Sequence, residues 1–414
     1  MTGCALRRLA GTIAARVLTP LLQLLRWVPA AVTAASTFYC LITTFAAFRF
    51  ARRRSKPTPL DTKLPMVSIL KPLKGADPNM YEALRSHCLQ DYPEYEMLCG
   101  ITSTDDLAAD VVEKLIREFP DKKIRLVSCV KRLGANGKVS SLMQLTQVAT
   151  AEYLLVNDSD IRVESDYLRT VIAELEQPNV GLVTCLYRAI SGDSLGSRLE
   201  ALGISTDFMP GVLAADLIEG GVQFGLGSTL AFRKTDLSAI GGLGEIVDYL
   251  ADDYELGNRI ARLGRKIHLS RAVVETNLPA YDFALFWAHQ MRWARTIRAS
   301  RPGGYLGLLL TFTLPWALAM VACNGREPWA WELGFTALVA RFVLAVWTSR
   351  FVLAEKRAAP MLLLPIRDLL AVAVWAAGWF GNSILWRGER FVLKHGRLIP
   401  EPGGVSHGTH DLKT

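Results

Sequence analysis

Two groups of carboxylates in the middle of the chain have a spacing suited to metal binding and proton transfer. Asp158 and Asp160 stand two residues apart after an apolar run, and Asp252, Asp253 and Glu255 form a second group. Mg²⁺ and Mn²⁺ take oxygen ligands, and in nucleotide sites one or two carboxylates hold the cation together with substrate phosphates. The first pair therefore predicts a site for a cation and a diphosphate. In the second group, neighbouring negative charges favour a raised pKa, which suits a general base.

Both groups also have a structural interpretation. Acidic residues are common in turns that follow strands, and residues 252–255 precede a helical pattern at 256–263, where carboxylates cap free N–H groups. Taken alone, Asp158 and Asp160 favour the turn, and the second group leaves capping and catalysis equally open. The full run at 153–160 favours a site for the pair, because it places them at the carboxyl end of an apolar strand.

A third group combines aromatic and cationic side chains on one predicted helix. The segment HQMRW, residues 289–293, lies within 283–298, a stretch rich in Phe, Trp and Arg. This composition is typical of a helix in the lipid head-group region. Arg292 carries the fork of donors that grips a departing diphosphate, and Trp293 could line a sugar pocket. We expect the helix to serve both purposes.

The elements that position these side chains follow an α/β pattern. Short apolar runs alternate with stretches of helical period, which predicts strands joined by helical crossovers in a largely parallel, buried sheet. The expected strands are 67–70, 95–101, 124–130, 153–156 and 181–186. Ligands bind beyond the carboxyl ends of the strands in such sheets. Asp106 follows the second strand and Asp158 the fourth, so both are predicted at one rim.

Apolar segments of membrane length lie on both sides of this predicted domain. Residues 28–48 carry no charge, and about 20 residues at 1.5 Å each suffice to cross the hydrocarbon layer. We expect an anchor here, because the run is long for a cleaved signal peptide. Further apolar segments follow at 304–323, 329–347 and 361–386. The last two contain charged residues, so a re-entrant or interfacial element is an alternative to a span.

The expected organisation has six parts. They are an N-terminal segment and anchor at 1–50, a linker at 51–64, a catalytic domain at 65–278, an interfacial helix at 279–303, membrane helices at 304–390 and a basic, polar tail at 391–414.

Charge and cysteine content narrow the class of protein. The net charge of +8 comes from 47 Lys and Arg against 39 Asp and Glu, and the excess beside the apolar segments suits anionic lipid head groups. The central domain has no basic stripe interleaved with aromatics, which argues against nucleic acid. Basic residues at 49–56 favour a cytoplasmic middle domain, although Arg7, Arg8, Arg16 and Arg26 lie on the other side. Seven cysteines without a C-x-x-C pair indicate neither a disulfide framework nor a zinc site.

Together, the three groups resemble the successive aspartate motifs and the (Q/R)-x-x-R-W element of inverting, family-2-like glycosyltransferases, and more narrowly the ceramide glucosyltransferase family. The likeness runs from 67 to about 298. Its narrower marks are LKPLKGADPN at 70–79, DYPEYE at 91–96, NGK at 136–138 and DSDIRV at 158–163. The resemblance implies a GT-A fold with a Rossmann-like, mostly parallel sheet, a UDP-sugar donor and a divalent cation, Mg²⁺ or Mn²⁺.

The resemblance also implies roles for single residues. Asp158 and Asp160 would handle the metal and the diphosphate, and Asp253 would deprotonate the acceptor hydroxyl. Arg292 and Trp293 would close over the donor. The remaining positions assigned to the UDP-sugar are Lys71, Pro72, Lys74, Asp106, Lys138 and His289.

Two positions depart from the family pattern. His289 occupies the first place of the Q/R-x-x-R-W element, and Asp160 stands where ceramide-specific relatives carry Gly. For Lys71, Lys74 and Lys138, a solvated surface position is the alternative to the nucleotide side.

The resemblance is strongest to the bacterial branch linked to hopanoid biosynthesis. It implies transfer of N-acetylglucosamine to bacteriohopanetetrol at the cytoplasmic side of the bacterial inner membrane. Ceramide glucosylation from UDP-glucose is the alternative. A processive polysaccharide synthase is a further alternative that the small number of spans disfavours, and the acidic positions disfavour a non-catalytic receptor. The sequence indicates no oligomeric state.

Overall fold

The computed structural model describes residues 2–54, 64–75, 77, 79–355, 360–386 and 389–405, with side chains described for residues 23–401 of these ranges. The expected linker and tail therefore lie partly outside the described residues, at 55–63 and 406–414.

An eight-stranded mixed sheet forms the centre of the molecule, in the order β3-β2-β1-β4-β7-β6-β8-β5. The strands are β1 (Val67–Pro72), β2 (Tyr95–Ile101), β3 (Lys123–Ser128), β4 (Tyr153–Val156), β5 (Ile161–Arg162), β6 (Val180–Ile190), β7 (Leu230–Arg233) and β8 (Lys266–Asn277). Strands β3, β2, β1 and β4 pair in parallel, as do β6 and β8. Strand β7 is antiparallel to both neighbours and β5 to β8. The predicted α/β fold with a mostly parallel sheet is confirmed, and β5, β7 and β8 are strands that the apolar pattern did not indicate.

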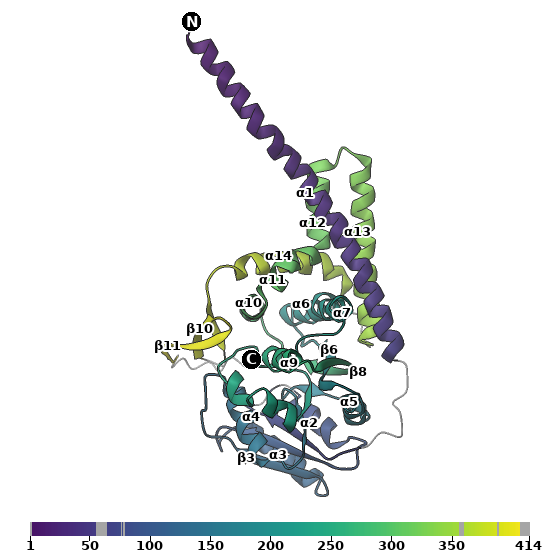
Figure 1. The fold of residues 1–414 in the computed structure, drawn as a ribbon, viewed down its shortest axis with the longest axis vertical. Helices are drawn as coiled ribbons and strands as arrows, with labels where there is room; N and C mark the ends of the chain where they lie inside the picture. The colour runs from purple at the N-terminus through teal and green to yellow at the C-terminus, as the bar shows by residue number, and fades with distance from the viewer. Residues whose placement is uncertain are drawn as a thin grey trace.

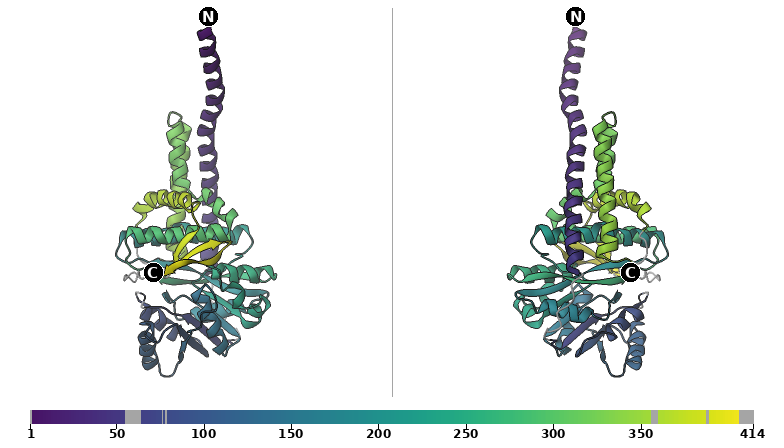
Figure 2. Two further views of the ribbon diagram at one scale, coloured as in Figure 1. Left: turned by 90° about the vertical axis from the view of Figure 1, so that its left-hand side faces the viewer. Right: turned by 90° about the vertical axis from the view of Figure 1, so that its right-hand side faces the viewer.

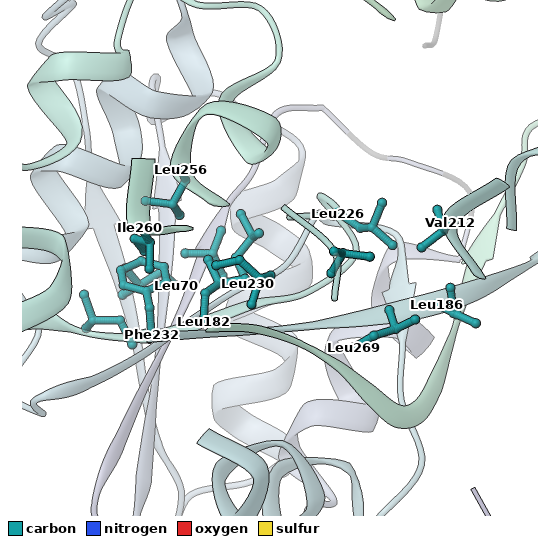
Figure 3. Packing of buried hydrophobic residues seen from close by; sticks show 14 of the residues in the cluster. Leu70, Leu182, Leu186, Val212, Leu226, Leu230, Phe232, Leu256, Ile260 and Leu269 are labelled. Carbon is teal, nitrogen blue, oxygen red and sulfur yellow. The ribbon is translucent and has the colours of Figure 1, made fainter. Parts of the chain in front are cut away.

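Helices cover both faces of this sheet. They are α2 (Met80–Cys88), α3 (Ala108–Glu118), α4 (Gly137–Val148), α5 (Tyr167–Leu175), α8 (Lys234–Ala239), the short η2 (Leu243–Ile246) and α9 (Asp252–Arg262). Neighbouring residues of a strand point to opposite faces, so Ile69 joins one apolar cluster and Leu70 the other. Phe232 of β7 shares the second cluster with Leu256 and Ile260 of α9 (Figure 3). Burial on both faces explains why the strands are continuous apolar runs.

Three long helices extend away from the sheet side by side (Figures 1 and 2). They are α1 (Thr2–Arg54), α12 (Thr313–Asn324) and α13 (Pro328–Trp347). Among the described residues, four helical segments are long and apolar enough to cross a membrane, namely Gln23–Arg54, Leu195–Ile218, Pro328–Val352 and Met361–Gly378. A pair bent by 56°, Pro302–Thr311 with Thr313–Asn324, is a fifth candidate. The anchor expected at 28–48 lies inside α1.

A second set of helices lies across the direction of α1, between the long helices and the sheet (Figures 1 and 2). This crosswise layer contains α6 (Leu195–Gly203), the π-helical turn η1 (Ile204–Phe208), α7 (Met209–Ile218), α10 (Phe283–Ser300) and α14 (Leu364–Gly378). Helix α14 packs on α10 within this layer, and Met361–Gly378 is also long and apolar enough to cross a membrane. The span and the interfacial helix at 361–386 therefore both stay predictions. The apolar segment α6–α7 was not expected inside the catalytic domain.

A buried ion network joins the long helices to the crosswise layer. Arg341 of α13 donates to both carboxylate oxygens of Asp368 in α14, at 2.7 and 3.0 Å, and to Asp207 of η1 at 2.5 Å. Arg367 lies 3.6 Å from Asp207 and donates to Gln290 of α10 at 3.3 Å. Charged side chains in apolar surroundings occur in such paired form because an unpaired buried charge is costly.

A small antiparallel sheet near the C-terminal end packs against the loop before α9. Its strands are β9 (Ser383–Trp386), β10 (Glu389–Lys394) and β11 (Arg397–Val405), in the order β11-β10-β9. Leu250 packs with Phe391 and Leu398 of this sheet, and Leu398 N–H donates to the Asp248 carbonyl at 2.7 Å. Residues up to 390, and with them β9, were expected in membrane helices, and 391–414 only as a basic, polar tail, so this sheet was not predicted. The remaining elements are α11 (Pro302–Gly307), η3 (Leu308–Thr311), η4 (Thr348–Val352) and η5 (Met361–Leu363).

Candidate active site

The turn after β4 is fixed by a buried amide. Asn157 donates to the Ser228 carbonyl at 2.7 Å and to the Tyr167 hydroxyl at 2.9 Å. Both contacts are buried, so the chain leaves the strand in a defined direction. Asp158 and Asp160 follow at the carboxyl end of β4, where the strand pattern placed them.

Two buried lysines approach this turn. Lys138, at the start of α4, lies 2.7 Å from Asp158 Oδ1 and 3.2 Å from Asp252 Oδ2. Burial lowers the pKa of Lys138, but Asp158, Asp252 and Asp253 outweigh it and raise the pKa, so the ammonium stays charged. Lys71 donates to the Asp158 carbonyl at 3.2 Å, and burial lowers its pKa to about 7. A solvated surface position is therefore excluded for both side chains.

Asp253 is held by two backbone N–H groups. Gly227 N–H donates to Asp253 Oδ2 and Tyr254 N–H to Asp253 Oδ1, each at 2.8 Å. Burial and the neighbouring Asp252 carboxylate raise the pKa of Asp253 to about 6, against the opposing effect of Lys138. A carboxylate with a raised pKa suits a general base. The cap residue of α9 is Ala251, without a side-chain cap, and Asp252, Asp253 and Glu255 lie in the first turn of the helix, where carboxylates also complement the macrodipole. The helix-start role and the role as a base are therefore compatible in this group.

Gly227 marks the point on which the charged groups converge. A Cβ atom at this position would lie 3.0 Å from Asp158 Oδ2, 3.3 Å from Asp253 Oδ2 and 3.7 Å from Lys138 Nζ. Side chains from the β4 turn, the start of α9 and the start of α4 therefore surround a single cradle. Only a residue without a side chain leaves this space open.

Asp158 and Asp160 fit a divalent cation. Burial and the Asp158 carboxylate raise the pKa of Asp160 to about 6, and a cation bound between the two would relieve this repulsion. Thr276 donates a hydrogen bond to Asp160. Within the described parts of the chain, no group of three or more His, Cys, Asp or Glu side chains gathers for a metal. Two carboxylates are nevertheless the number of protein ligands expected when substrate phosphates supply the other ligands of the cation.

Asp106 lies at the edge of this site, beyond β2. Its Oδ1 accepts from Gly75 N–H at 2.8 Å and from Ala108 N–H at 3.0 Å. The loop that carries Gly75 is tied to the β4 turn, because Ser159 donates to Asp77 at 2.5 Å. Asp106 and the turn therefore border one loop, as the shared rim predicted.

Two further predicted donor-side residues lie on β1 and the loop after it. Pro72 is the buried last residue of β1. Lys74 is exposed and close enough to Glu389 of the small sheet to interact electrostatically.

The HQMRW segment lies on α10 and reaches the site through aromatic side chains. The rings of Tyr187 and Phe208 lie 6.0 Å apart, those of Phe208 and Trp293 5.4 Å apart, and those of Trp293 and His289 5.5 Å apart. Tyr187 interacts electrostatically with both Glu200 and the carboxylate of Asp253. These rings, which we call the aromatic wall, connect the HQMRW segment to the carboxylates.

Glu200 of α6 anchors the polar side chains of the same segment. His289 Nδ1 lies 2.7 Å from one carboxylate oxygen of Glu200 and 2.9 Å from the other. Gln290 donates to Glu200 at 3.5 Å, and Arg292 interacts with it electrostatically. Arg292 of α10 is therefore near Glu200 of α6. The local sequence of α6 does not distinguish Glu200 from a solvated residue, so sequence reasoning missed it.

Other arginines of α10 have a structural task. Arg298 donates to the Gly378 carbonyl at 2.6 Å and Arg295 to the Phe380 carbonyl at 3.1 Å. Arg298 therefore pairs with the carbonyl of the last residue of α14, one of the four carbonyls that the end of a helix leaves unpaired. Arg295 pairs with a carbonyl two residues beyond it. These two side chains therefore have a structural role in addition to the head-group location predicted for the helix.

Sequence reasoning also missed Tyr187, Phe208 and Gly227. The small-residue run at 225–228 before β7 was the available signal for Gly227, since glycine in such a run indicates close approach of other groups. Tyr187 and Phe208 looked like ordinary apolar residues of a strand and a helix.

The central sheet and the site at its carboxyl edge define a glycosyltransferase of the GT-A class. The structure is similar to that of the mannosyltransferase PcManGT from Pyrobaculum calidifontis in complex with GDP-Man and Mn²⁺, with a TM-score of 0.52 and 21% identity over 86% of this chain and 99% of that one. This likeness shows the fold. The sequence model of glycosyl transferase family 21 matches residues 28–399, and the chain belongs to this family.

Curated relatives share part of their length with this chain. Ceramide glucosyltransferase 3 of Caenorhabditis elegans is 28% identical over 61% of this chain and 57% of its own length. Ceramide glucosyltransferase 1 of the same organism is 25% identical over 84% of this chain and 78% of its own. A beta-monoglucosyldiacylglycerol synthase of Trichormus variabilis is 26% identical over 62% of this chain and 52% of its own.

Proposed function

We propose that this protein is an inverting membrane glycosyltransferase that moves one hexose from a UDP-sugar to a hydroxyl of a membrane lipid. The observation that carries the proposal is the cradle at Gly227, where Asp158, Asp253 and Lys138 meet at the carboxyl edge of the sheet. Ligands of open α/β sheets bind at this edge. The crosswise layer lies on the membrane side of the same site, which gives a lipid acceptor a route to it (Figure 1).

We assign the binding site of the UDP-sugar to the carboxyl ends of β1, β2 and β4. Asp106 and the loop at 73–79 border the nucleotide, and Lys71 and Pro72 form its floor. Lys138 carries a buried positive charge beside Asp158, which stabilises the diphosphate. Arg292 supplies a second cation from α10.

Asp158 and Asp160 would hold a divalent cation, in keeping with the Mn²⁺ in the structurally similar mannosyltransferase. Bound there, the cation would neutralise charge on the departing diphosphate.

The transfer needs one base and no enzyme nucleophile. The acceptor oxygen forms a bond to the anomeric carbon while the bond from that carbon to the diphosphate oxygen breaks. The acceptor proton passes to Asp253, and UDP leaves with the bonding electron pair. A phosphate leaving group needs charge stabilisation more than a proton, and Lys138 and Arg292 provide it. Attack opposite the leaving group inverts the anomeric centre.

The comparisons favour glucose as the sugar and ceramide or diacylglycerol as the acceptor class. Relatives named as ceramide glucosyltransferases match 61% and 84% of this chain, and a beta-monoglucosyldiacylglycerol synthase matches 62% of it. The alternative of the sequence analysis is thus better supported than its main prediction of N-acetylglucosamine and a hopanoid. We further assign the catalytic domain to the cytoplasmic side of a bacterial inner membrane, since Arg52, Arg53 and Arg54 end α1 next to it.

Product analysis tests this proposal. Purified protein is incubated with Mg²⁺ or Mn²⁺ and either UDP-glucose or UDP-N-acetylglucosamine, together with ceramide, diacylglycerol or bacteriohopanetetrol. Mass spectrometry and NMR then identify the lipid product and its anomeric configuration. We expect one inverted glucose on ceramide or diacylglycerol. A hopanoid product with N-acetylglucosamine would restore the first prediction, a chain of sugars would indicate a processive synthase, and retained configuration would exclude the single displacement.

A further inference from the structure

Helix α14 has its charged side chains inside the protein and apolar side chains outside. Its two charged residues, Arg367 and Asp368, are both buried. The exposed positions recur every three or four residues and are all apolar. The largest of these side chains are 51% to 92% exposed, namely Leu362, Ile366, Leu369 and Phe380. An exposed face that is apolar along its whole length indicates contact with another apolar surface or with lipid.

Both ends of the segment that contains α14 are attached to the catalytic domain. Before α14, the Leu353 carbonyl accepts a hydrogen bond from Arg188 of β6 at 3.0 Å. After it, Leu398 N–H of β11 donates to the Asp248 carbonyl at 2.7 Å. Among the described residues between these contacts, only Met361–Gly378 is long and apolar enough to cross a membrane. A single crossing would place the two contacts on opposite sides of the bilayer, so both contacts argue against it.

The direction of α14 agrees with this topology. It lies across α1, between the long helices and the central sheet (Figures 1 and 2), and it packs on α10. Since α1 is the expected anchor, a helix that lies across it runs along the membrane plane. The apolar segment Leu195–Ile218 belongs to the same layer and connects β6 to β7, which are neighbours in the central sheet. Its two ends therefore also lie on one side.

Two tryptophans mark the far border of the bilayer on the crossing helices. The rings of Trp27 in α1 and Trp329 in α13 stack at 5.9 Å between centroids. Beside them, Arg26 pairs with Glu327 at 3.2 Å. Tryptophan rings next to charged side chains are typical of the interface between lipid and water, so this pair gives a reference for depth.

The depth of α14 follows from its contact with α13. Asp368 pairs with Arg341, which comes 12 residues after Trp329, a rise of about 18 Å at 1.5 Å per residue. On α1, Cys40 packs on α13 at the same level and comes 13 residues after Trp27, a rise of about 20 Å. The hydrocarbon layer is about 30 Å thick, which places α14 about 10 Å inside its near border.

We propose that α14 lies in the plane of the membrane, embedded in the leaflet next to the catalytic domain, and that its outer face binds the lipids of this leaflet. Crossing is then left to α1, α12 and α13, and the small C-terminal sheet is on the same side of the membrane as the central sheet. This inference goes beyond the proposed function and does not depend on the reaction.

Depth measurements along α14 test the inference. In a background in which Cys4 and the exposed Cys323 are replaced by Ser, a nitroxide label is attached to single cysteines in protein reconstituted into bilayers. The variants are Leu362→Cys, Ile366→Cys, Leu369→Cys and Phe380→Cys. The ratio of access by dissolved oxygen and by a water-soluble nickel complex gives the depth of each label. We expect all four labels at similar depths, about 5 to 10 Å inside the near surface.

The exposed face of α13 supplies the matched control. Its variants are Trp331→Cys, Phe335→Cys, Val339→Cys and Val343→Cys, at exposed positions. Because α13 is assigned as a crossing helix, we expect the depth to increase from Trp331 to a maximum near Val339 and to decrease again at Val343.

Labelling from one side of the membrane gives an independent readout. A membrane-impermeant maleimide is added to vesicles of a single orientation that contain Lys394→Cys of the small sheet, Glu113→Cys of α3 or Arg326→Cys of the turn between α12 and α13. All three positions are exposed. We expect Lys394→Cys and Glu113→Cys to react from the same side, and Arg326→Cys from the opposite side.

Each other outcome overturns the inference. A depth profile that peaks in the middle of α14, or reaction of Lys394→Cys from the side of Arg326→Cys, would show that α14 crosses. Free access of the nickel complex to all four labels would show that the face lies in water. Absence of sugar transfer overturns the proposed function alone, because neither readout depends on activity.

Discussion

Asp253 is buried and accepts hydrogen bonds from two backbone N–H groups. Burial and these hydrogen bonds act on its pKa in opposite directions, and the pKa decides whether the carboxylate can act as a base. The bonds from Gly227 and Tyr254 favour the charged form, whereas burial and Asp252 disfavour it and leave the pKa at about 6. The carboxylate is therefore ionised at neutral pH but basic enough to take a proton. The sequence motif around Asp253 does not predict this pKa, because one of the two N–H donors is Gly227, which belongs to a different loop.

The pH dependence of the rate follows from this value. Asp253 works as a base only when ionised, so kcat/KM is full above its pKa and falls as pH decreases through about 6. Asp160 has a similarly raised pKa, and a bound cation favours its ionised form. We therefore expect that raising the cation concentration makes the acid limb less steep without removing it. A rate measured between about pH 5 and pH 8 that shows no acid limb would argue against Asp253 as the base.

Gly227→Ala tests the cradle. The new Cβ would lie 3.0 Å from Asp158 Oδ2 and 3.3 Å from Asp253 Oδ2, so one of the carboxylates has to shift. We expect kcat/KM to fall about 100-fold, since small misplacements in a site carry that cost. Gly303→Ala serves as the control, because a Cβ there meets nothing within 4 Å. Equal activity of the two variants would show that the cradle is not the site.

At the scale of elements, the small C-terminal sheet braces the helix start that carries Asp252 and Asp253. Leu250 N–H donates to the Gly396 carbonyl at 3.2 Å, and Arg132 donates to both carboxylate oxygens of Glu389 at 2.7 and 2.9 Å. The loop before α4 and the loop before α9 are thereby both attached to this sheet. The sheet belongs to the architecture of the site even though it lies at the end of the chain.

Phe391→Ala tests this bracing. Phe391 is 2% exposed in the cluster with Leu250, and loss of a buried Phe costs about 3 to 5 kcal/mol. We expect faster hydrogen exchange at the amides of 248–252 and a lower kcat. Ile399→Ala, on the next strand and 43% exposed, is the matched control. Unchanged exchange at 248–252 in Phe391→Ala would contradict the bracing.

The elements that were predictable are those with a long, regular pattern. The parallel strands β1 to β4 were predictable because both faces of the sheet are apolar. Strand β7, which runs antiparallel through the centre of the sheet, was not predicted. Its four residues are too short a run to show a strand pattern, and they do not indicate the direction of the strand. Likewise Glu200 and the task of Arg295 and Arg298 depend on partners about 90 residues away in the chain, which no local pattern shows.

At the scale of the whole molecule, a single buried network couples the long helices to the crosswise layer. Arg341 of α13 is 2% exposed and pairs with Asp207 and Asp368. Asp207 and Arg367 continue the chain of contacts to Gln290, next to His289. The aspartate motifs predicted the rim of the site, and the apolar runs predicted membrane helices. The connection between the two parts was not predictable, because residues 207, 341 and 368 have no shared motif.

Arg341→Met tests the coupling. Removal of one partner from a buried ion pair leaves the other charge uncompensated and costs about 3 to 5 kcal/mol. We expect a lower unfolding temperature in detergent, and partial recovery in the double variant Arg341→Met with Asp368→Leu, which removes the more deeply buried of the two carboxylates that lose their partner. Arg350→Met is the control, since Arg350 is exposed and donates to the Glu355 carbonyl at 3.2 Å. Equal unfolding temperatures for the Arg341 and Arg350 variants would contradict this account.

The turnover of Asp253→Asn is the most direct measurement of the central claim that the carboxylates around Gly227 transfer the sugar. Asn keeps the size and can accept one of the two N–H bonds through its amide oxygen, but it takes up no proton. Glu255→Gln, in the same turn of α9 and paired with Arg259, is the matched control. We predict that Asp253→Asn lowers kcat for sugar transfer to lipid about 1,000-fold with UDP affinity retained, while Glu255→Gln stays near wild type. Turnover of Asp253→Asn close to that of wild type would contradict the account.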